Sequence, residues 1–325
     1  MKKILTLCTS LIFASSMLFA GTFDDLTGTE SEINAEIEEY KANIANGFDA
    51  FSIDMSNSLS STATLQNVWA DAYIGQFFPS VPMHFGGGVN FGAASLDATG
   101  LQDALSPLGM DSYIPDTLAI PVVNADLKIG GIFLPFDLGV SIMKFDTSAL
   151  SNFNISSLDS IDVDYFSVGA NFRYRVLKEN ILLPNVSIGA LYNYTSGSIS
   201  VGEDDTNASY DYAAQIFGLE AQVSKNFLGI LTPFAGGRAL VAIIDSEWDY
   251  SMEISGAAAT AYGSTTISDS EPYTYTLDDY DSIGDLNFQV FAGLGVNLLI
   301  FQFTPSVSYN SNNVWAGAFS VHVKL

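Results

Sequence analysis

Residues 166–176 read FSVGANFRYRV. As a helix, this stretch would spread Arg173 and Arg175 around most of its surface. As a strand it separates into two faces, because successive side chains point to opposite sides of a sheet. One face carries the apolar and aromatic residues Phe166, Val168, Ala170, Phe172, Tyr174 and Val176. The other face is small and polar apart from the two arginines, so the stretch predicts a β-strand between an apolar and a polar environment.

The first twenty residues have the features of a secretory signal peptide. Two lysines are followed by an apolar run and then by the small residue Ala20. We therefore expect residues 1–20 to be removed on export. The single cysteine, Cys8, lies within that segment, so the mature protein is expected to contain no thiol, disulfide or cysteine metal site.

Composition favours a membrane protein. Of the 325 residues, 48% are apolar and 14% charged, and the mean hydropathy is +0.26. Beyond the signal peptide there is no apolar run of about 18 residues, the length that a spanning helix needs. Without Lys2 and Lys3, nine basic residues stand against 36 acidic ones, which argues against a nucleic-acid partner. An exported, apolar chain of this kind fits a closed β-barrel, in which every backbone group is paired.

Residues 21–82 are expected to form an N-terminal helix and linker that could plug a barrel. Thr29 and Glu32 have the spacing of a capping box, which predicts a helix start. Apolar residues then recur at steps of three or four and form one stripe: Ile33, Ile37, Tyr40, Ile44, Phe48 and Phe51. The Ser-rich segment 56–67 is expected to be a linker or loop. The aromatic segment 68–82 contains two prolines and is ambiguous.

Residues 83–325 repeat the alternation of the opening stretch. We count about ten strands, with an uncertainty of two that allows twelve. The connections alternate in length, as in barrels with a periplasmic and an extracellular side. Short turns are expected near 134–135, 177–181, 226–230 and 298–301, and longer loops rich in Asp, Ser, Thr and Gly near 95–119, 147–160, 201–209 and 250–285, where only the turn near 310–313 is short on the same side. The fold class is therefore all-β: a transmembrane antiparallel up-and-down β-barrel, with the short turns in the periplasm and an N-terminal helical segment.

Over this range the chain resembles the outer-membrane β-barrel proteins of bacteria. The alternating residues run to the C-terminus, as in the signal that the barrel-insertion machinery reads, although Leu325 replaces the usual aromatic residue. The resemblance implies a cell outer membrane location, with membrane lipid and that machinery as partners. A fainter similarity, carried by the segment WADAYIG at 69–75 behind a helix, is to the long-chain fatty-acid transporter family, whose N-terminal hatch fills the lumen. Members of that family have more strands than we count here.

In a barrel of this kind the polar face points into the lumen. Five charged residues are candidates for ligand binding there: Lys128, Arg173, Arg175, Glu220 and Arg238. They could form a structural ion network, because buried charges must be paired. Alternatively, they could attract the carboxylate of a lipidic or small-molecule ligand. Inward apolar residues would suit an acyl chain: Met143, Leu191, Phe234, Leu240 and Phe291.

We predict no enzyme activity, no catalytic residue, no metal site and no cofactor. The two histidines, His84 and His322, are expected at the periplasmic end, where the first and last strands meet, and to pack the seam. No GxSxG motif occurs. Acidic residues cluster at 278–285 and 203–205 without the spacing of an EF-hand, so we expect solvated loop charge there and not a Ca²⁺ site.

Two functions follow as expectations. The first is a porin-like channel or transporter for a small or hydrophobic solute, including a fatty-acid-like one. The second is a surface-exposed structural barrel or adhesin that acts through its acidic extracellular loops.

Overall fold

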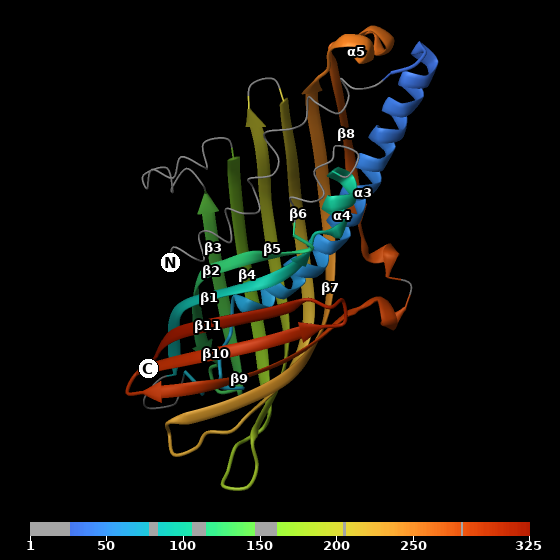
Figure 1. Ribbon diagram of the computed structural model, residues 1–325. Helices are drawn as coiled ribbons and strands as arrows, with labels where there is room; N and C mark the ends of the chain where they lie inside the picture. Colours follow the sequence, from blue (N-terminus) through green and yellow to red (C-terminus); the bar gives the residue numbers. More distant parts are fainter. Residues whose placement is uncertain (1–26, 78–83, 106–114, 147–160, 204–205, 281) are drawn as a thin grey trace.

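A computed structural model describes residues 27–77, 84–105, 115–146, 161–203, 206–280 and 282–325. The signal peptide lies outside the described residues. Figure 1 shows a β-barrel with a long helix passing into it. The described ranges contain these strands: β1 (Phe85–Asp97), β2 (Thr117–Gly130), β3 (Phe136–Asp146), β4 (Ile161–Leu177), β5 (Asn185–Glu203), β6 (Thr206–Ser224), β7 (Leu231–Glu253), β8 (Thr266–Tyr275), β9 (Asn287–Leu298), β10 (Phe301–Asn310) and β11 (Trp315–Lys324).

Ten of these strands close the barrel. Neighbours in sequence pair antiparallel from β1 to β7, then β7 pairs with β9, and the ring continues through β10 and β11. β11 pairs with β1 from Gly86↔Lys324 to Ala94↔Ala316, which closes the seam. The prediction of a ten-stranded antiparallel barrel with an N-terminal helix is confirmed.

The extracellular side differs from the expectation. β8 lies within the expected long loop 250–285 and pairs with the upper part of β7, from Ile244↔Tyr275 to Glu253↔Thr266. β5 and β6 also pair as far as Glu203↔Thr206, where a longer loop was expected at 201–209. The polar composition of these segments predicted loops. It reflects strands that continue above the membrane, where both faces of a hairpin can be polar.

The two faces of the opening stretch are separated as predicted. On β4, Phe172 and Tyr174 are 42% and 41% exposed on the outside, whereas Arg173 between them is 1% exposed and points into the lumen. The same alternation continues around the wall and produces a belt of outward apolar side chains. Exposed members of this belt include Phe91, Val123, Leu127, Val140, Ile188, Leu219, Val290 and Phe319.

Helix α3 (Glu30–Leu65) begins as predicted and ends later than predicted. The Thr29 hydroxyl accepts a hydrogen bond from the Glu32 amide, and the Glu32 carboxylate accepts one from the Thr29 amide. The predicted capping box is therefore present. The predicted linker at 56–67 is helical as far as Leu65. Four of its hydroxyls, those of Ser56, Ser60, Thr62 and Thr64, donate to backbone carbonyls three or four residues earlier in the helix.

The N-terminal segment runs through the barrel from the long-loop end to the short-turn end. At the start of α3, the Asn34 amide donates to the carbonyl of Ala261 in α5 (Gly256–Tyr262), above the barrel. Further along, Ser61 contacts β9 and β10 inside the wall. The Phe77 amide then donates a hydrogen bond to the carbonyl of Gly131, beside the turn between β2 and β3. A short helix, α4 (Thr99–Leu105), packs on α3 near the extracellular end.

None of the helices in the described ranges has both the length and the apolar character needed to cross a bilayer.

Candidate functional site

All five predicted lumen residues lie on the inner side of the wall, and an alternating chain of charges joins four of them. Lys128 on β2 and Arg173 on β4 lie on either side of Asp137, with Nζ–Oδ1 and Nε–Oδ1 distances of 3.4 and 3.1 Å. Arg173 is 4.0 Å from Glu220 on β6, which pairs in turn with Arg238 on β7 at 3.1 Å. The side chains of this chain of charges are at most 7% exposed, so each charge is buried beside an opposite one.

Arg175 lies apart from this network, nearer the periplasmic end. Its guanidinium carbon is 4.4 Å from the ring centroid of Tyr73, in the segment that follows α3. A guanidinium over an aromatic face is a favourable cation–π arrangement. Arg175 thus packs against the N-terminal segment.

The charge network faces the N-terminal segment as well. The amide of Ile74 donates to Asp137 Oδ2 at 3.2 Å. Gln222 accepts from Arg173 Nη1 at 2.7 Å and donates to the carbonyls of Trp69 and Ala70 at 2.9 and 3.2 Å. The same side chains that neutralise one another therefore hold residues 66–77, which we call the plug segment.

A second cluster was only partly foreseen from the sequence. The Trp69 indole donates to Asp126 Oδ2 at 3.1 Å and stacks on His322, with ring centroids 4.0 Å apart. His322 Nε2 lies 3.1 Å from the same carboxylate oxygen. Nearby, Lys324 Nζ is 2.6 Å from Asp71. The seam position of His322 was predicted, whereas the roles of Trp69 and Asp71 were not.

Gln66, directly after α3, joins the plug segment to the inner wall of the barrel through hydrogen bonds. Its side chain donates to Ser167 Oγ at 2.7 Å and accepts from Asn193 at 3.2 Å. Its carbonyl accepts from Asn90 and Asn124 at 3.1 and 2.7 Å. Ser141 on β3 also donates to the Gln66 side-chain oxygen, at 3.3 Å. One plug residue therefore contacts five neighbouring strands of the barrel, β1 to β5.

Glycines on the wall give the plug segment room. A Cβ at Gly295 would collide with the Cβ of Ala70, and one at Gly130 would collide with the carbonyl oxygen of Gly75. The backbone of the plug segment thus approaches the wall more closely than any larger residue allows.

Two cavities that described residues line inside the barrel are small. One cavity of about 20 Å³ is lined in part by Asn67, Glu220 and Arg238, and another of about 10 Å³ by Trp69, Phe234 and Phe291. Volumes of this size hold about one water molecule each. The inward apolar residues that were expected to suit an acyl chain are packed; Phe291, for example, lies 3.9 Å beneath the Arg238 guanidinium.

A comparison with protein-family models finds no match, and neither does a comparison with curated proteins. Among solved structures, the chain is similar to the translocator domain of the autotransporter NalP from Neisseria meningitidis, with 11% identity, 85% of this chain and 96% of that chain covered, and a TM-score of 0.37. It is similar to the outer membrane protease OmpT from Escherichia coli, with 8% identity, coverage of 78% and 98%, and a TM-score of 0.40. It is also similar to the KdgM porin, with 9% identity, coverage of 72% and 98%, and a TM-score of 0.27.

The strand pairing and the outward apolar belt assign the class of protein. A closed antiparallel barrel with an apolar exterior and a polar interior is the architecture of transmembrane β-barrels. The protein is an integral β-barrel of the outer membrane, in contact with membrane lipid. The ends of the barrel follow from its connections: the short turns mark the periplasmic end and the long ones the extracellular end.

Proposed function

We propose that the protein is a closed outer-membrane anchor that presents a rigid acidic platform at the cell surface. One observation supports this most: a single apolar core joins the first half of α3 to the upper parts of β6, β7 and β8, while the second half of α3 fills the barrel below. Phe48 of α3 stacks on Trp248 of β7 at 5.2 Å, and Phe51 packs edge-on against Tyr210 of β6 at 5.4 Å.

We call the first half of α3, the upper parts of β6, β7 and β8, and α5 the platform, because they share this core. Trp248 stacks on Tyr250 at 5.9 Å, and α5 closes the top with Ala258 buried in the same core. Lys41 of α3 pairs with Asp269 of β8 at 3.4 Å. Helix and hairpin therefore support each other above the membrane, as a surface for recognition requires.

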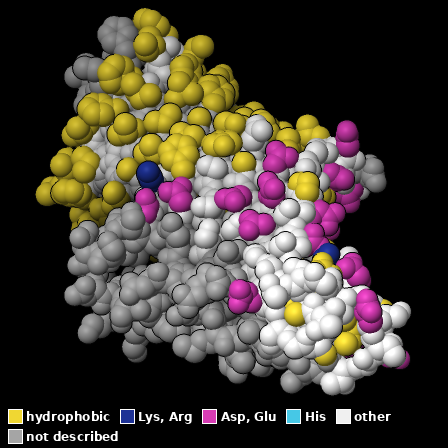
Figure 2. All heavy atoms as spheres, turned by 90° about the horizontal axis from the view of Figure 1, so that it is seen from above, with side chains coloured by type: hydrophobic (Ala, Val, Ile, Leu, Met, Phe, Trp, Pro, Cys, Tyr) yellow, Lys and Arg dark blue, Asp and Glu magenta, His cyan; other side chains and the backbone are white. Residues whose placement is uncertain are grey.

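The outer surface of the platform is acidic. Its exposed carboxylates include Glu30, Glu32, Glu38, Glu39, Asp211, Asp245, Glu247, Asp249, Glu253 and Glu271. Figure 2, seen from the extracellular end, shows acidic side chains gathered along one side. Such a field favours a cationic partner, with binding that weakens as salt rises.

A binding experiment tests the proposal. The protein in lipid nanodiscs is titrated with poly-L-lysine, beside the variant E38Q/E39Q/E247Q/E271Q. We expect salt-sensitive binding that the variant weakens more per removed charge than the control D103N/D278N, whose charges lie outside the platform. If both variants lost the same affinity per removed charge, net charge alone would explain the binding, and a specific platform would be contradicted. In planar bilayers, the proposed closed barrel should pass no steady current.

A second candidate is a channel for a small solute, opened by displacement of the plug segment. Its support is the polarity of the lower contacts: Gln66, Asp71 and Ile74 are held by hydrogen bonds and ion pairs that water can replace. A fatty-acid-like solute draws no support from the small cavities. Conductance that appears in a Q66A/W69A variant would favour this candidate, and a silent variant that is still folded would exclude it.

A further inference from the structure

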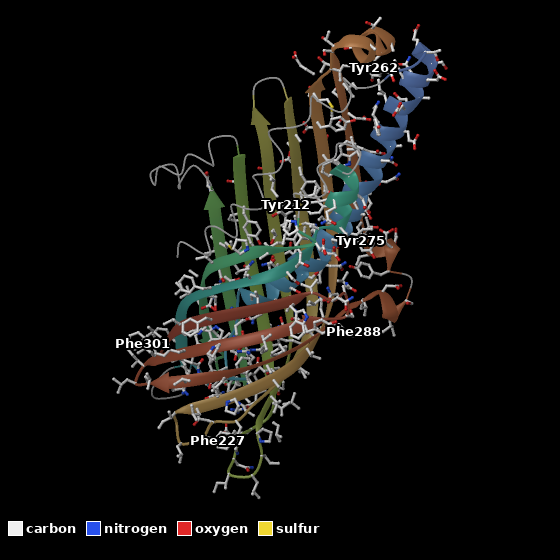
Figure 3. All side chains as sticks on the ribbon, in the orientation of Figure 1. Tyr212, Phe227, Tyr262, Tyr275, Phe288 and Phe301 are labelled. Carbon is white, nitrogen blue, oxygen red and sulfur yellow. The ribbon has the colours of Figure 1, made fainter. Side chains whose placement is uncertain are left out.

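The periplasmic turns of this barrel end in large apolar side chains. Four short connections close this end, and their tips carry Phe133 and Leu134, Ile181 and Leu182, Leu228, and Leu299. Ile181, Leu182 and Leu228 are 95%, 89% and 96% exposed, and Leu299 is fully exposed. We call these six residues the apolar rim. Phe227, next to Leu228, marks this end in Figure 3.

Three of the rim residues occupy backbone conformations that disfavour them. Phe133, Leu228 and Leu299 have φ angles of 64°, 56° and 57°, in the left-handed region where glycine and asparagine are preferred. The extracellular turn between β10 and β11 uses the preferred type, with Asn313 at 62°. The periplasmic turns therefore keep apolar residues against the local backbone preference, which points to a role for the side chains.

Side chains hydrogen-bond several backbone groups of the turn between β4 and β5. Asn180 Oδ1 accepts the amides of Leu182 and Leu183 at 2.9 Å each. The Lys225 ammonium donates to the carbonyls of Asn180, Ile181 and Leu183. The turn between β6 and β7 has a similar contact, because Asn226 Oδ1 accepts a hydrogen bond from the Gly229 amide at 2.7 Å. Backbone groups that need no water are a requirement for a segment that leaves water.

At the turn between β2 and β3 and the turn between β9 and β10, the rim continues the lipid-facing belt with no polar residue between them. Outward residues at the lower strand ends are also apolar and exposed: Phe85, Ile129, Val176, Leu298 and Phe301. The exposed cation Lys178 lies at the foot of β4, beside the turn that Lys225 holds. Lys178 lies between the belt and the tip, and a lysine at such a position can extend its ammonium to the anionic headgroups while its stem stays among acyl chains.

We propose that the apolar rim is a lipid-binding surface that inserts its turns into the periplasmic leaflet of the outer membrane, with Lys178 at the level of phospholipid headgroups. The rim thus extends the membrane-embedded surface to the turns themselves. A rim that docks a periplasmic protein or a second copy of this chain would instead be covered by protein.

Site-directed spin labelling tests the insertion. In a C8S background, single cysteines at Leu182, Leu228 and Leu299 are labelled in the full protein, reconstituted in phosphatidylethanolamine and phosphatidylglycerol vesicles. Leu127 in the belt serves as the lipid control and Asp278 as the water control. We expect the rim labels to collide with oxygen more than with an aqueous nickel complex, as at Leu127. Nickel-dominated collisions as at Asp278, or shielding from both reagents, would overturn the proposal.

A second variant separates insertion from folding. The triple variant F133N/L228N/L299N places asparagine at positions whose backbone favours it, so its thermal stability in detergent should be unchanged or higher. Its spontaneous insertion into the same vesicles should be about tenfold slower because three apolar tips are lost. Unchanged insertion kinetics would show that the tips do not engage lipid.

Discussion

Trp69 is the side chain on which the closed barrel depends most at the scale of single residues. It is 1% exposed, stacks on His322 and donates to the Asp126 carboxylate. Truncating a buried Trp to alanine costs about 3–5 kcal/mol. W69A should therefore lower the stability of the detergent-solubilised protein by about that amount, measured by urea unfolding. W315A, which removes a lipid-facing ring that is 59% exposed, is the control. Equal stabilities for the two variants would contradict the assigned role.

Asp54 is a residue whose charge opposes folding. It lies on α3 near the extracellular end of the barrel, where partial burial and the nearby charge of Asp97 raise its pKa from 3.8 to about 6. Because the folded state then holds a proton that the unfolded state has lost, this residue makes the protein less stable as pH rises from about 4 to about 6. D54N should be more stable than the parent at neutral pH, and the difference should shrink as the pH falls through that window. Parallel curves of melting temperature against pH for the two proteins would refute this.

The five candidate lumen residues show what alternation can and cannot predict at this scale. Period-2 spacing places Arg173 and Glu220 inside the barrel, since the outer face meets lipid. It cannot show that they face a second segment of the chain. That information resides in Gln66, Trp69 and Asp71, whose irregular segment has no periodicity to read.

At the scale of elements, the second half of α3 is where sequence and structure differ most. Serine and threonine disfavour helices in water, because they compete for backbone hydrogen bonds, and so the segment resembled a linker. Inside a narrow polar lumen the same residues are small enough to fit and find partners on the wall. Ser58, for example, donates to the carbonyl of Ser95 on β1 at 2.9 Å. The tertiary environment therefore overrides the local preference.

Ser61 tests this fit. Its hydroxyl accepts from Gln289 and Asn310 at 3.3 and 3.1 Å. S61A should cost about 1–3 kcal/mol through the two unpaired donors. S61L should cost about 1–3 kcal/mol more through overpacking and should loosen the plug segment, detectable as new protease cleavage of purified protein. A42L, on the exposed face of α3, is the control. If S61L resembled A42L in stability and cleavage, the lumen would be looser than described.

At the scale of the whole molecule, the barrel was predictable because lipid and lumen impose opposite requirements on alternate residues over ten strands. The β7–β8 hairpin was not, because it leaves the membrane and carries acidic residues on its outer face, such as Glu247 and Asp249. The path of the N-terminal segment was not predictable either. An amphipathic stripe shows that one face of α3 packs against another surface, but it does not show which surface.

In the structure, the chain from residue 30 to residue 77 begins above the barrel at the extracellular end and then runs through the lumen to the periplasmic end. Labelling of intact cells tests this path most directly, with E30C in a C8S background and a membrane-impermeant maleimide. K178C, on the periplasmic side, is the control and should react only after the outer membrane is permeabilised. We predict that E30C reacts in intact cells. Labelling of E30C only after permeabilisation would place the start of α3 in the periplasm and contradict the account.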